Sequence, residues 1–370
     1  MDRNFTWTEI DLNAIRHNFW VLRKLAGRAK ILTVIKADAY GHGMLPIARV
    51  LVQEKVDFLG LSNLSEGIAL RRAGIKTPVL LFETTLPEQA KDIIDYHLTP
   101  TVCTDELAAA LNRYAQKRKC VVDIHVKVDT GMGRLGLWYE EIPAFMKKIR
   151  RLRNLRVQGI YTHFPAADID RAFTRKQIQQ LMILLQQLDA DGWQIPYVHA
   201  ANSVGLAGYG THIFNLSRPG LMLYGLYPRP ELEKKIDLHP AMSVHSKIIF
   251  LKRIDKGRSI SYGRTFIARK PMTVATLPIG YSNGYLRGLS GKADVLVNGR
   301  RCPVLGRITM DQIVVDVSKI KNPRLGMPVV ILGKQGKDEV CAYELAQHAR
   351  TINYEIVCSL GSRLPRILRK

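Results

Sequence analysis

Short apolar runs alternate with longer amphipathic stretches along residues 30–226. Strands buried on both faces of a sheet read as continuous apolar runs, and helices between them connect strands in parallel. Eight such runs occur, at residues 31–35, 58–61, 78–82, 98–102, 121–128, 157–162, 197–199 and 221–224. Residues 12–22, 105–117 and 171–188 have the spacing of amphipathic helices. This alternation predicts an α/β fold, a (β/α)8 barrel of the TIM type.

The pattern changes after about residue 235. Strand-like alternation and turn residues dominate there, with predicted strands at 244–251, 259–262, 273–279, 295–297, 303–305, 313–317 and 329–332. Asn298-Gly299 is a hairpin signal, and residues 343–350 are the one helix expected in this part. We therefore expect residues 1–235 to form the barrel and residues 236–370 to form a C-terminal mainly-β domain. The polar, proline-bearing stretch 228–235 marks the boundary.

Charge raises the question of a polyanionic partner. The chain has 55 lysines and arginines against 32 acidic residues, a formal net charge of +23, and a pI of about 9.9. The most basic segment, residues 147–153, also fits an amphipathic helix, and it has no interleaved aromatic residues of the kind that stack on bases. We therefore expect no nucleic-acid partner.

Location and redox state follow from local composition. The first thirty residues are interrupted by charges, and no later apolar run approaches the roughly 20 residues of a membrane span. Five scattered cysteines without a CxxC spacing predict reduced thiols and no metal. We expect a cytoplasmic protein without a membrane segment.

Polar residues follow the predicted strands, where a barrel places its active site. Lys36 comes directly after an apolar run, so burial would lower the pKa of its amine, although a rim lysine that reaches into water remains an alternative. Ser203 and Gly220 offer donors for a phosphate, His163 a flat ring and Arg218 a fixed donor. An amine, a phosphate cradle and a flat cavity together indicate a pyridoxal phosphate site.

Residues 131–136 match the GxGxxG pattern of dinucleotide-binding proteins. That motif also requires an acidic residue at the end of the following strand, to hold the ribose. Here the following strand ends in Tyr161-Thr162-His163, which supplies none. We interpret these glycines as a turn that lets the backbone approach a substrate closely.

Longer motifs resemble one known family, the alanine racemases. They are WTEIDL at 7–12, VIKADAYGHG at 34–43, KVDTGMGRLG at 127–136, HAANS at 199–203, RPG at 218–220, SYG at 261–263, GY at 280–281, MD at 310–311 and INYE at 352–355. The likeness runs in order through both halves of the chain, from residue 7 to about 366.

The resemblance implies a homodimer that uses pyridoxal 5'-phosphate to interconvert L- and D-alanine, the D-isomer serving peptidoglycan synthesis. Its two bases would be Lys36 and, reaching in from the partner subunit, Tyr262. It assigns the cofactor contacts to Lys36, Tyr40, His163, Asn202, Ser203, Arg218, Gly220, Leu221 and Tyr354. It assigns the substrate carboxylate to Arg134 and the backbone of Met310, and supporting roles to Lys127, His199, Tyr281 and Asp311.

Other functions share parts of this pattern. A racemase that accepts serine or larger amino acids is the main alternative, and a basic amino-acid decarboxylase has a related architecture. A protein of cofactor homeostasis would share the barrel without so large a second domain. The sequence also departs mildly from the family, since Asp38 stands where asparagine is frequent and Pro165 stiffens the loop after His163. These departures bear on substrate preference.

Overall fold

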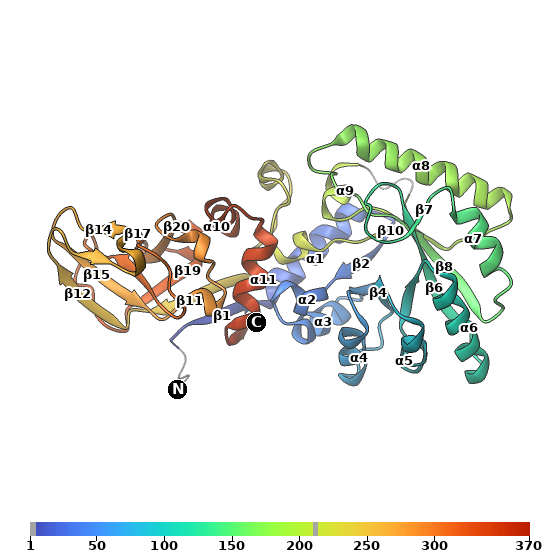
Figure 1. The fold of residues 1–370 in the computed structure, drawn as a ribbon, viewed down its shortest axis with the longest axis horizontal. Helices are drawn as coiled ribbons and strands as arrows, with labels where there is room; N and C mark the ends of the chain where they lie inside the picture. Colours follow the sequence, from blue (N-terminus) through green and yellow to red (C-terminus); the bar gives the residue numbers. More distant parts are fainter. Residues whose placement is uncertain (1–4, 210–213) are drawn as a thin grey trace.

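The computed structural model describes residues 5–209 and 214–370. The molecule is elongated, with a barrel of strands and helices at one end, a mainly-β domain at the other and helix α11 (Asn353–Arg363) between them (Figure 1). The barrel and the mainly-β domain that the hydrophobic pattern predicts are both confirmed.

In the described residues, eight parallel strands form the barrel wall in the order β10, β2, β3, β4, β5, β6, β8, β9. They are β2 (Lys30–Val34), β3 (Phe58–Leu61), β4 (Val79–Thr84), β5 (Thr99–Val102), β6 (Val122–Asp129), β8 (Leu155–Tyr161), β9 (Tyr197–His199) and β10 (Leu216–Ser217). The short β7 (Leu137–Trp138) adds to β6. Between β9 and β10, Asn215 donates its N–H to the carbonyl of Val198 and accepts the N–H of Val198 on its side chain. The barrel is therefore nearly closed.

Helices surround this wall. They are α1 (Leu12–Ala26), α3 (Met44–Gln53), α4 (Leu64–Arg72), α5 (Ala90–Asp95), α6 (Asp105–Arg118), α7 (Ile142–Ile149), α8 (Arg171–Ala190) and α9 (Ser203–Gly208). Helix α1 begins where the side chain of Asp11 accepts the N–H groups of Asn13 and Ala14, and it buries Ile15 and Phe19. The three helices predicted from periodicity, α1, α6 and α8, are confirmed.

The eighth predicted strand was wrong. Residues Leu221–Tyr224 form a 3₁₀ helix, and the strand that completes the wall is β10, five residues earlier. All four residues of the 3₁₀ helix are buried, so they give the same continuous apolar run as a strand buried on both faces. The correction places Arg218 directly after the eighth strand.

The second domain is built on one large sheet, in the order β12, β15, β18, β17, β16, β19, β11, β1, β21, with β20 paired to β19. Its strands are β1 (Trp7–Asp11), β11 (Met242–Lys247), β12 (Phe250–Ile254), β15 (Met272–Leu277), β16 (Asp294–Val297), β17 (Arg300–Leu305), β18 (Ile313–Asp316), β19 (Pro328–Gln335), β20 (Asp338–Val340) and β21 (Arg366–Arg369). A small hairpin pairs β13 (Ser259–Ile260) with β14 (Phe266–Ile267). The Asn298-Gly299 turn joins β16 to β17 as predicted.

Two features of this domain were not expected. Helix α11 follows α10 (Ala342–Ala349), so the described part of the domain has two helices of this kind rather than one. The N-terminal strand β1 pairs with β11 and, in parallel, with β21, so residues 7–11 lie in the sheet of the second domain. The domain boundary near residue 235 stays a prediction.

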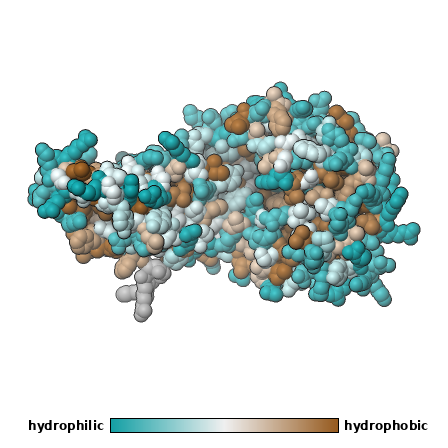
Figure 2. Space-filling view, viewed as in Figure 1, coloured by the Kyte–Doolittle hydropathy of each residue, from teal (hydrophilic) through white to brown (hydrophobic). Residues whose placement is uncertain are grey.

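On the face shown in Figure 2, hydrophobic residues are interspersed among hydrophilic ones rather than gathered into one apolar area. Within the described ranges, no helix is both long enough and apolar enough to cross a membrane.

Candidate active site

A cavity of about 350 Å³ opens at the carboxyl ends of the barrel strands. It is lined by Val34, Lys36, Tyr40, Phe82, Lys127, Arg134, Leu135, Tyr161, His163, Asn202, Ser203, Arg218, Gly220, Leu221 and Tyr354. Every barrel residue predicted for the site lines it except His199, which lies directly behind Arg218. Tyr354 reaches the same cavity from α11 of the second domain.

Lys36 stands at the start of an unusual backbone turn. The next four residues, Ala37 to Tyr40, all have left-handed helical φ values of 51° to 55°. Such a conformation costs roughly 1–2 kcal/mol for each residue other than glycine, so surrounding contacts must hold it. The turn ends at Gly41, where an added Cβ would lie 2.6 Å from the carbonyl oxygen of Val357 on α11. Strain and close packing therefore fix the position of Lys36 and Tyr40.

Side chains from three parts of the fold hold this turn. Glu66 of α4 accepts the N–H of Ala37, and the imidazole Nδ1 of His42 lies 3.0 Å from the carbonyl oxygens of Ala39 and Tyr40. Asp38 accepts the N–H of Met44 at 2.7 Å and pairs with Arg366 of β21 at 2.5 Å. The aspartate that departs from the family pattern thus ties the lysine turn to the C-terminal strand.

Arg218 is held by a directed chain of hydrogen bonds. It donates to Nδ1 of His199 at 2.8 Å, and Nε2 of His199 lies 2.8 Å from Nδ1 of His125. Because a guanidinium only donates, His199 must carry its proton on Nε2 and His125 on its own Nε2, which faces Gln158. Burial lowers the pKa of Arg218 to about 10 and that of His125 to about 4. Arg218 therefore remains a cationic donor next to neutral imidazoles.

The cavity carries four basic side chains, Lys36, Lys127, Arg134 and Arg218, and among the described residues no carboxylate lines it. Burial, then the nearby Arg134, lowers the pKa of Lys36. Burial, then Arg218, lowers the pKa of Lys127 to about 7. The amine of Lys127 therefore loses its proton near neutral pH, and the amine of Lys36 loses its proton at a lower pH than that of an exposed lysine. The cavity is thus suited to an anionic ligand.

One end of the cavity forms a cradle of small polar groups. The hydroxyl of Ser203 accepts the N–H of Gly220 at 3.1 Å, and a Cβ on Gly220 would lie 2.6 Å from the hydroxyl of Tyr40. Burial raises the pKa of Tyr354 to about 12 and also raises that of Tyr40, so both keep their protons and can donate. Their rings lie 5.7 Å apart. This cradle has the donors that a phosphate requires.

The loop that carries Arg134 is organised by Asp129. The two carboxylate oxygens of Asp129 accept the N–H groups of Gly131, Met132 and Gly133 at 2.7 to 2.8 Å. Those N–H groups are the ones that would face a pyrophosphate in a dinucleotide-binding protein. Their engagement by Asp129 is consistent with our interpretation of this glycine motif as a turn.

Sequence reasoning assigned no role to five residues at the site. Four of them line the cavity, namely Val34, Phe82, Leu135 and Tyr161, and His125 lies behind it. The ring of Tyr161 stacks on His199 at 4.6 Å, and both Lys127 and Arg218 lie over its face. Phe82 lines the cavity beside it, and His125 supports His199 from behind. Phe82 and Tyr161 lie at the carboxyl ends of predicted strands, and this position is the one signal that could have identified them.

Four predicted residues of the second domain lie outside this cavity. Tyr262, Tyr281, Met310 and Asp311 are all exposed on the second domain, Tyr262 to 70% and Met310 to 55%. Tyr262 sits in a turn whose neighbours Ser261 and Gly263 both have positive φ. Within one chain, Lys36 and the cradle therefore lie at the same cavity, whereas Tyr262 lies away from it.

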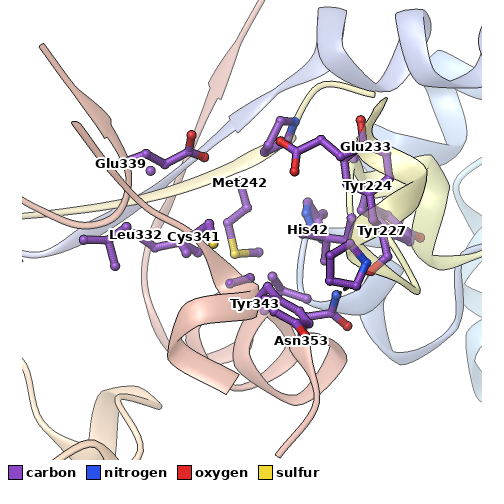
Figure 3. A pocket seen from close by; sticks show the side chains of 18 residues that line it. His42, Tyr224, Tyr227, Glu233, Met242, Leu332, Glu339, Cys341, Tyr343 and Asn353 are labelled. Carbon is purple, nitrogen blue, oxygen red and sulfur yellow. Dashed lines mark hydrogen bonds between the residues drawn. The ribbon is translucent and has the colours of Figure 1, made fainter. Parts of the chain in front are cut away.

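A second cavity, of about 240 Å³, lies between the barrel and the second domain (Figure 3). Tyrosines, Met242 and Leu332 line much of it, together with the carboxylates of Glu233 and Glu339. No lysine or arginine among the described residues lines it. This cavity lacks the charges that an anionic cofactor needs, so the barrel mouth is the candidate active site.

Sequence profiles of two domains match the chain. The profile described as the N-terminal domain of alanine racemase matches residues 10–228, and that of the C-terminal domain matches residues 241–368. The chain belongs to the alanine racemase family. It is therefore an enzyme of a family of isomerases. Alanine racemase of Halothermothrix orenii is 41% identical over 98% of this chain and 96% of its own length, and that of Carboxydothermus hydrogenoformans is 40% identical over 98% of both.

Solved alanine racemase structures have the same architecture. The enzyme of Clostridium difficile 630 superposes with a TM-score of 0.93 at 35% identity, covering 100% of this chain and 97% of its own. The enzyme of Bacillus anthracis with bound L-Ala-P gives a TM-score of 0.92 at 33% identity, covering 100% and 96%. The family resemblance drawn from the motifs is confirmed.

Proposed function

We propose that the chain is a pyridoxal phosphate-dependent racemase that interconverts L- and D-alanine in the cytoplasm, as a homodimer with shared active sites. The observation that carries this proposal is the set of four lysine and arginine side chains, with Lys36 among them, around a cavity that no carboxylate of the described residues lines. Such a cavity fits an anionic cofactor together with the carboxylate of an amino acid. The D-alanine produced would supply peptidoglycan synthesis.

The residues present fit the cofactor. Ser203, the backbone of Gly220 and Leu221, and the hydroxyls of Tyr40 and Tyr354 would hold its phosphate, with Asn202 and His163 beside them. Lys36 would hold it covalently. When bound, pyridoxal phosphate delocalises the electron pair left on the substrate Cα after deprotonation.

Arg218 would face the pyridine nitrogen as a hydrogen-bond donor. Its guanidinium does not give up a proton, and the ordered imidazoles of His199 and His125 behind it keep it in place. A donor that keeps its proton would leave this nitrogen unprotonated and less electron-withdrawing. Arg218 would thereby limit side reactions of the deprotonated substrate, such as transamination.

Racemisation requires a proton to leave one face of the Cα and another to arrive on the opposite face. Lys36, with a lowered pKa, would exchange a proton with the Cα from one face. Tyr262 of the partner subunit would do so from the other face. One base takes a proton while the other gives one, so each conversion exchanges their protonation states.

The substrate carboxylate would bind Arg134 and the N–H of the partner's Met310. The N–H of Tyr281 donates to the carbonyl of Thr309, which lies in the same peptide plane as the N–H of Met310. Ser282 donates to both Met310 and Asp311, which holds the loop further. These contacts explain why Tyr281 and Asp311 belong to the predicted site without touching the barrel cavity.

A circular-dichroism time course with L-alanine and with L-serine, with and without added pyridoxal phosphate, tests this function. We expect the signal of L-alanine to decay to zero and to decay faster with added cofactor. Equal decay with L-serine would favour a racemase of broader specificity. No decay with either amino acid by the cofactor-loaded protein would contradict the proposal.

A further inference from the structure

We propose that His17, Asp237 and His239 form a surface site for a divalent transition-metal cation such as Zn²⁺ or Ni²⁺. Their ligand atoms all lie within 4.8 Å of one another. The three residues come from helix α1 and from the connector that leads from the barrel to β11. Because His17 and His239 are far apart in the chain, no local spacing could have indicated this site.

The distances match the requirements of one cation. Nε2 of His17 lies 3.3 Å from one carboxylate oxygen of Asp237, and Nε2 of His239 lies 3.6 Å from the other. Tetrahedral ligands with bonds of about 2.0–2.2 Å are separated by about 3.3–3.6 Å. The two imidazoles are stacked, with centroids 3.9 Å apart and planes within 3°. Their planes must tilt apart to converge on an ion. The His239 side chain is 55% exposed and has room to tilt, whereas His17 is partly buried and its Nε2 also lies 3.0 Å from the carbonyl oxygen of Asp237, a contact that the ion would replace.

The backbone holds these ligands in place in advance. Asn18, the buried neighbour of His17, accepts the N–H of His239 at 2.8 Å and donates to its carbonyl at 2.8 Å. The carbonyl of His239 also passes so close to Gly225 that an added Cβ there would lie 1.9 Å away. The connector is thus fixed against α1, and only side-chain torsions remain to be ordered by an ion.

Charge and chemistry select the class of ion. The chain has a net charge of +23, yet none of the described lysines and arginines forms an ion pair with Asp237. Among the described residues, the carboxylate of Asp237 pairs with the imidazoles of His17 and His239. Imidazole nitrogen suits Zn²⁺, Ni²⁺ and Cu²⁺, whereas Mg²⁺ and Ca²⁺ prefer oxygen ligands. Water completes the shell, since the Asp237 and His239 side chains are 76% and 55% exposed. A bound ion would join the barrel to the connector of the second domain.

Calorimetric titration of chelator-treated holoenzyme with Ni²⁺ tests this site. We expect saturable binding of one ion per chain, a Ni²⁺-dependent rise in Tm, and no competition from Mg²⁺. Loss of a ligand should weaken binding at least about tenfold in His17→Ala, His239→Ala and Asp237→Asn. His97→Asn removes an exposed histidine elsewhere and should bind Ni²⁺ as the parent does.

Two outcomes would overturn the proposal. One is the absence of saturable Ni²⁺ binding by the parent. The other is parent-like binding by the three ligand variants, which would assign the ion to cysteine thiols or to the cofactor phosphate. Far-ultraviolet circular dichroism and the metal-free Tm identify a variant that fails to fold, and the decision then falls to the highly exposed Asp237→Asn.

Discussion

At the barrel mouth Arg218 is buried among hydrogen-bond partners from its own chain, whereas Tyr262 and Met310 of the second domain are largely exposed. The hydrogen bonds and the lowered pKa values of the first region come from burial and from groups of the same chain. In the second, hydrogen bonds from Tyr281 and Ser282 hold the loop of Met310, but the side chains of Met310 and Tyr262 face outward. A single chain thus holds the cofactor half of the proposed site and displays the other half on its surface.

Replacing Lys36 should have the largest effect. Lys36→Ala removes both the covalent attachment and one base, so we expect kcat to fall by at least about 10⁴-fold and the visible absorbance of bound cofactor to be lost. Racemisation is measured by circular dichroism and the cofactor by absorbance. The exposed Lys76→Ala serves as control and should match the parent. Substantial activity in Lys36→Ala would show that the barrel mouth is not the reacting site.

Replacing Tyr262 should reduce kcat by about 10²- to 10⁴-fold, because general acid–base catalysis contributes that much. Tyr262→Phe keeps the ring, so the absorbance of bound cofactor should remain. Parent-like turnover would rule out the two-base assignment.

A mixture of the two variants sharpens the comparison. In a dimer of one Lys36→Ala chain and one Tyr262→Phe chain, shared sites leave one site with both bases intact. Random reassortment of subunits should then restore about a quarter of the parent activity. If Tyr262 served the cavity of its own chain, the mixture would stay as inactive as its components.

Lys127 should have a smaller effect, on substrate binding. With a pKa of about 7 its amine is mostly neutral at pH 8, and neutral amines react with CO₂. A carbamate there would give Arg134 an anionic partner. We expect a ¹³C signal after incubation with labelled bicarbonate, growing as the pH rises through 7 and missing in Lys127→Met. That variant should raise KM for alanine by about tenfold with a smaller change in kcat. An unchanged KM would separate Lys127 from substrate binding.

The smallest effect should come from Asp38. Asp38→Asn loses the charge of the pair with Arg366 but keeps an acceptor for Met44, and asparagine tolerates the left-handed conformation. We expect the free energy of unfolding in urea to fall by about 0.5–1 kcal/mol, as for other partly exposed pairs, with kcat changed less than twofold. Asp105→Asn, which removes another exposed pair, is the control. A large loss of activity in Asp38→Asn would show that the turn after Lys36 depends on the charge of Asp38 more strongly than the contacts suggest.

The strands of the barrel were predictable because a strand that is buried on both faces has an uninterrupted run of apolar residues. The 3₁₀ helix at Leu221–Tyr224 was mistaken for a strand, since a short helix buried on every side also has no polar face. Strand β10 has only two residues, too few for any pattern. The pairing of β1 with β21 joins the two ends of the chain, and local periodicity contains no information about such partners.

The barrel residues of the site were predictable from their places at strand ends and from long motifs. The left-handed turn after Lys36 was not, because Ala37-Asp38-Ala39-Tyr40 contains no glycine and the conformation is imposed by Glu66, His42 and Arg366. The contacts of Lys127 and Arg218 with the ring of Tyr161 were not predictable either, because these residues come together only after folding. The turn after Lys36 and the contacts of Tyr161 both depend on segments that are distant from each other in the sequence.

The place of β1 has a consequence for how the protein is made. At 5–20 residues per second, the N-terminal strand would leave the ribosome about 20–70 s before β21 is synthesised. Until β11 and then β21 are synthesised, Thr8 and Ile10, which are buried in the finished sheet, lack their strand partners. A fragment that begins after the barrel would lack the strand between β11 and β21 and would expose two sheet edges, which invites aggregation. The barrel is, in topological terms, an insertion within the second domain.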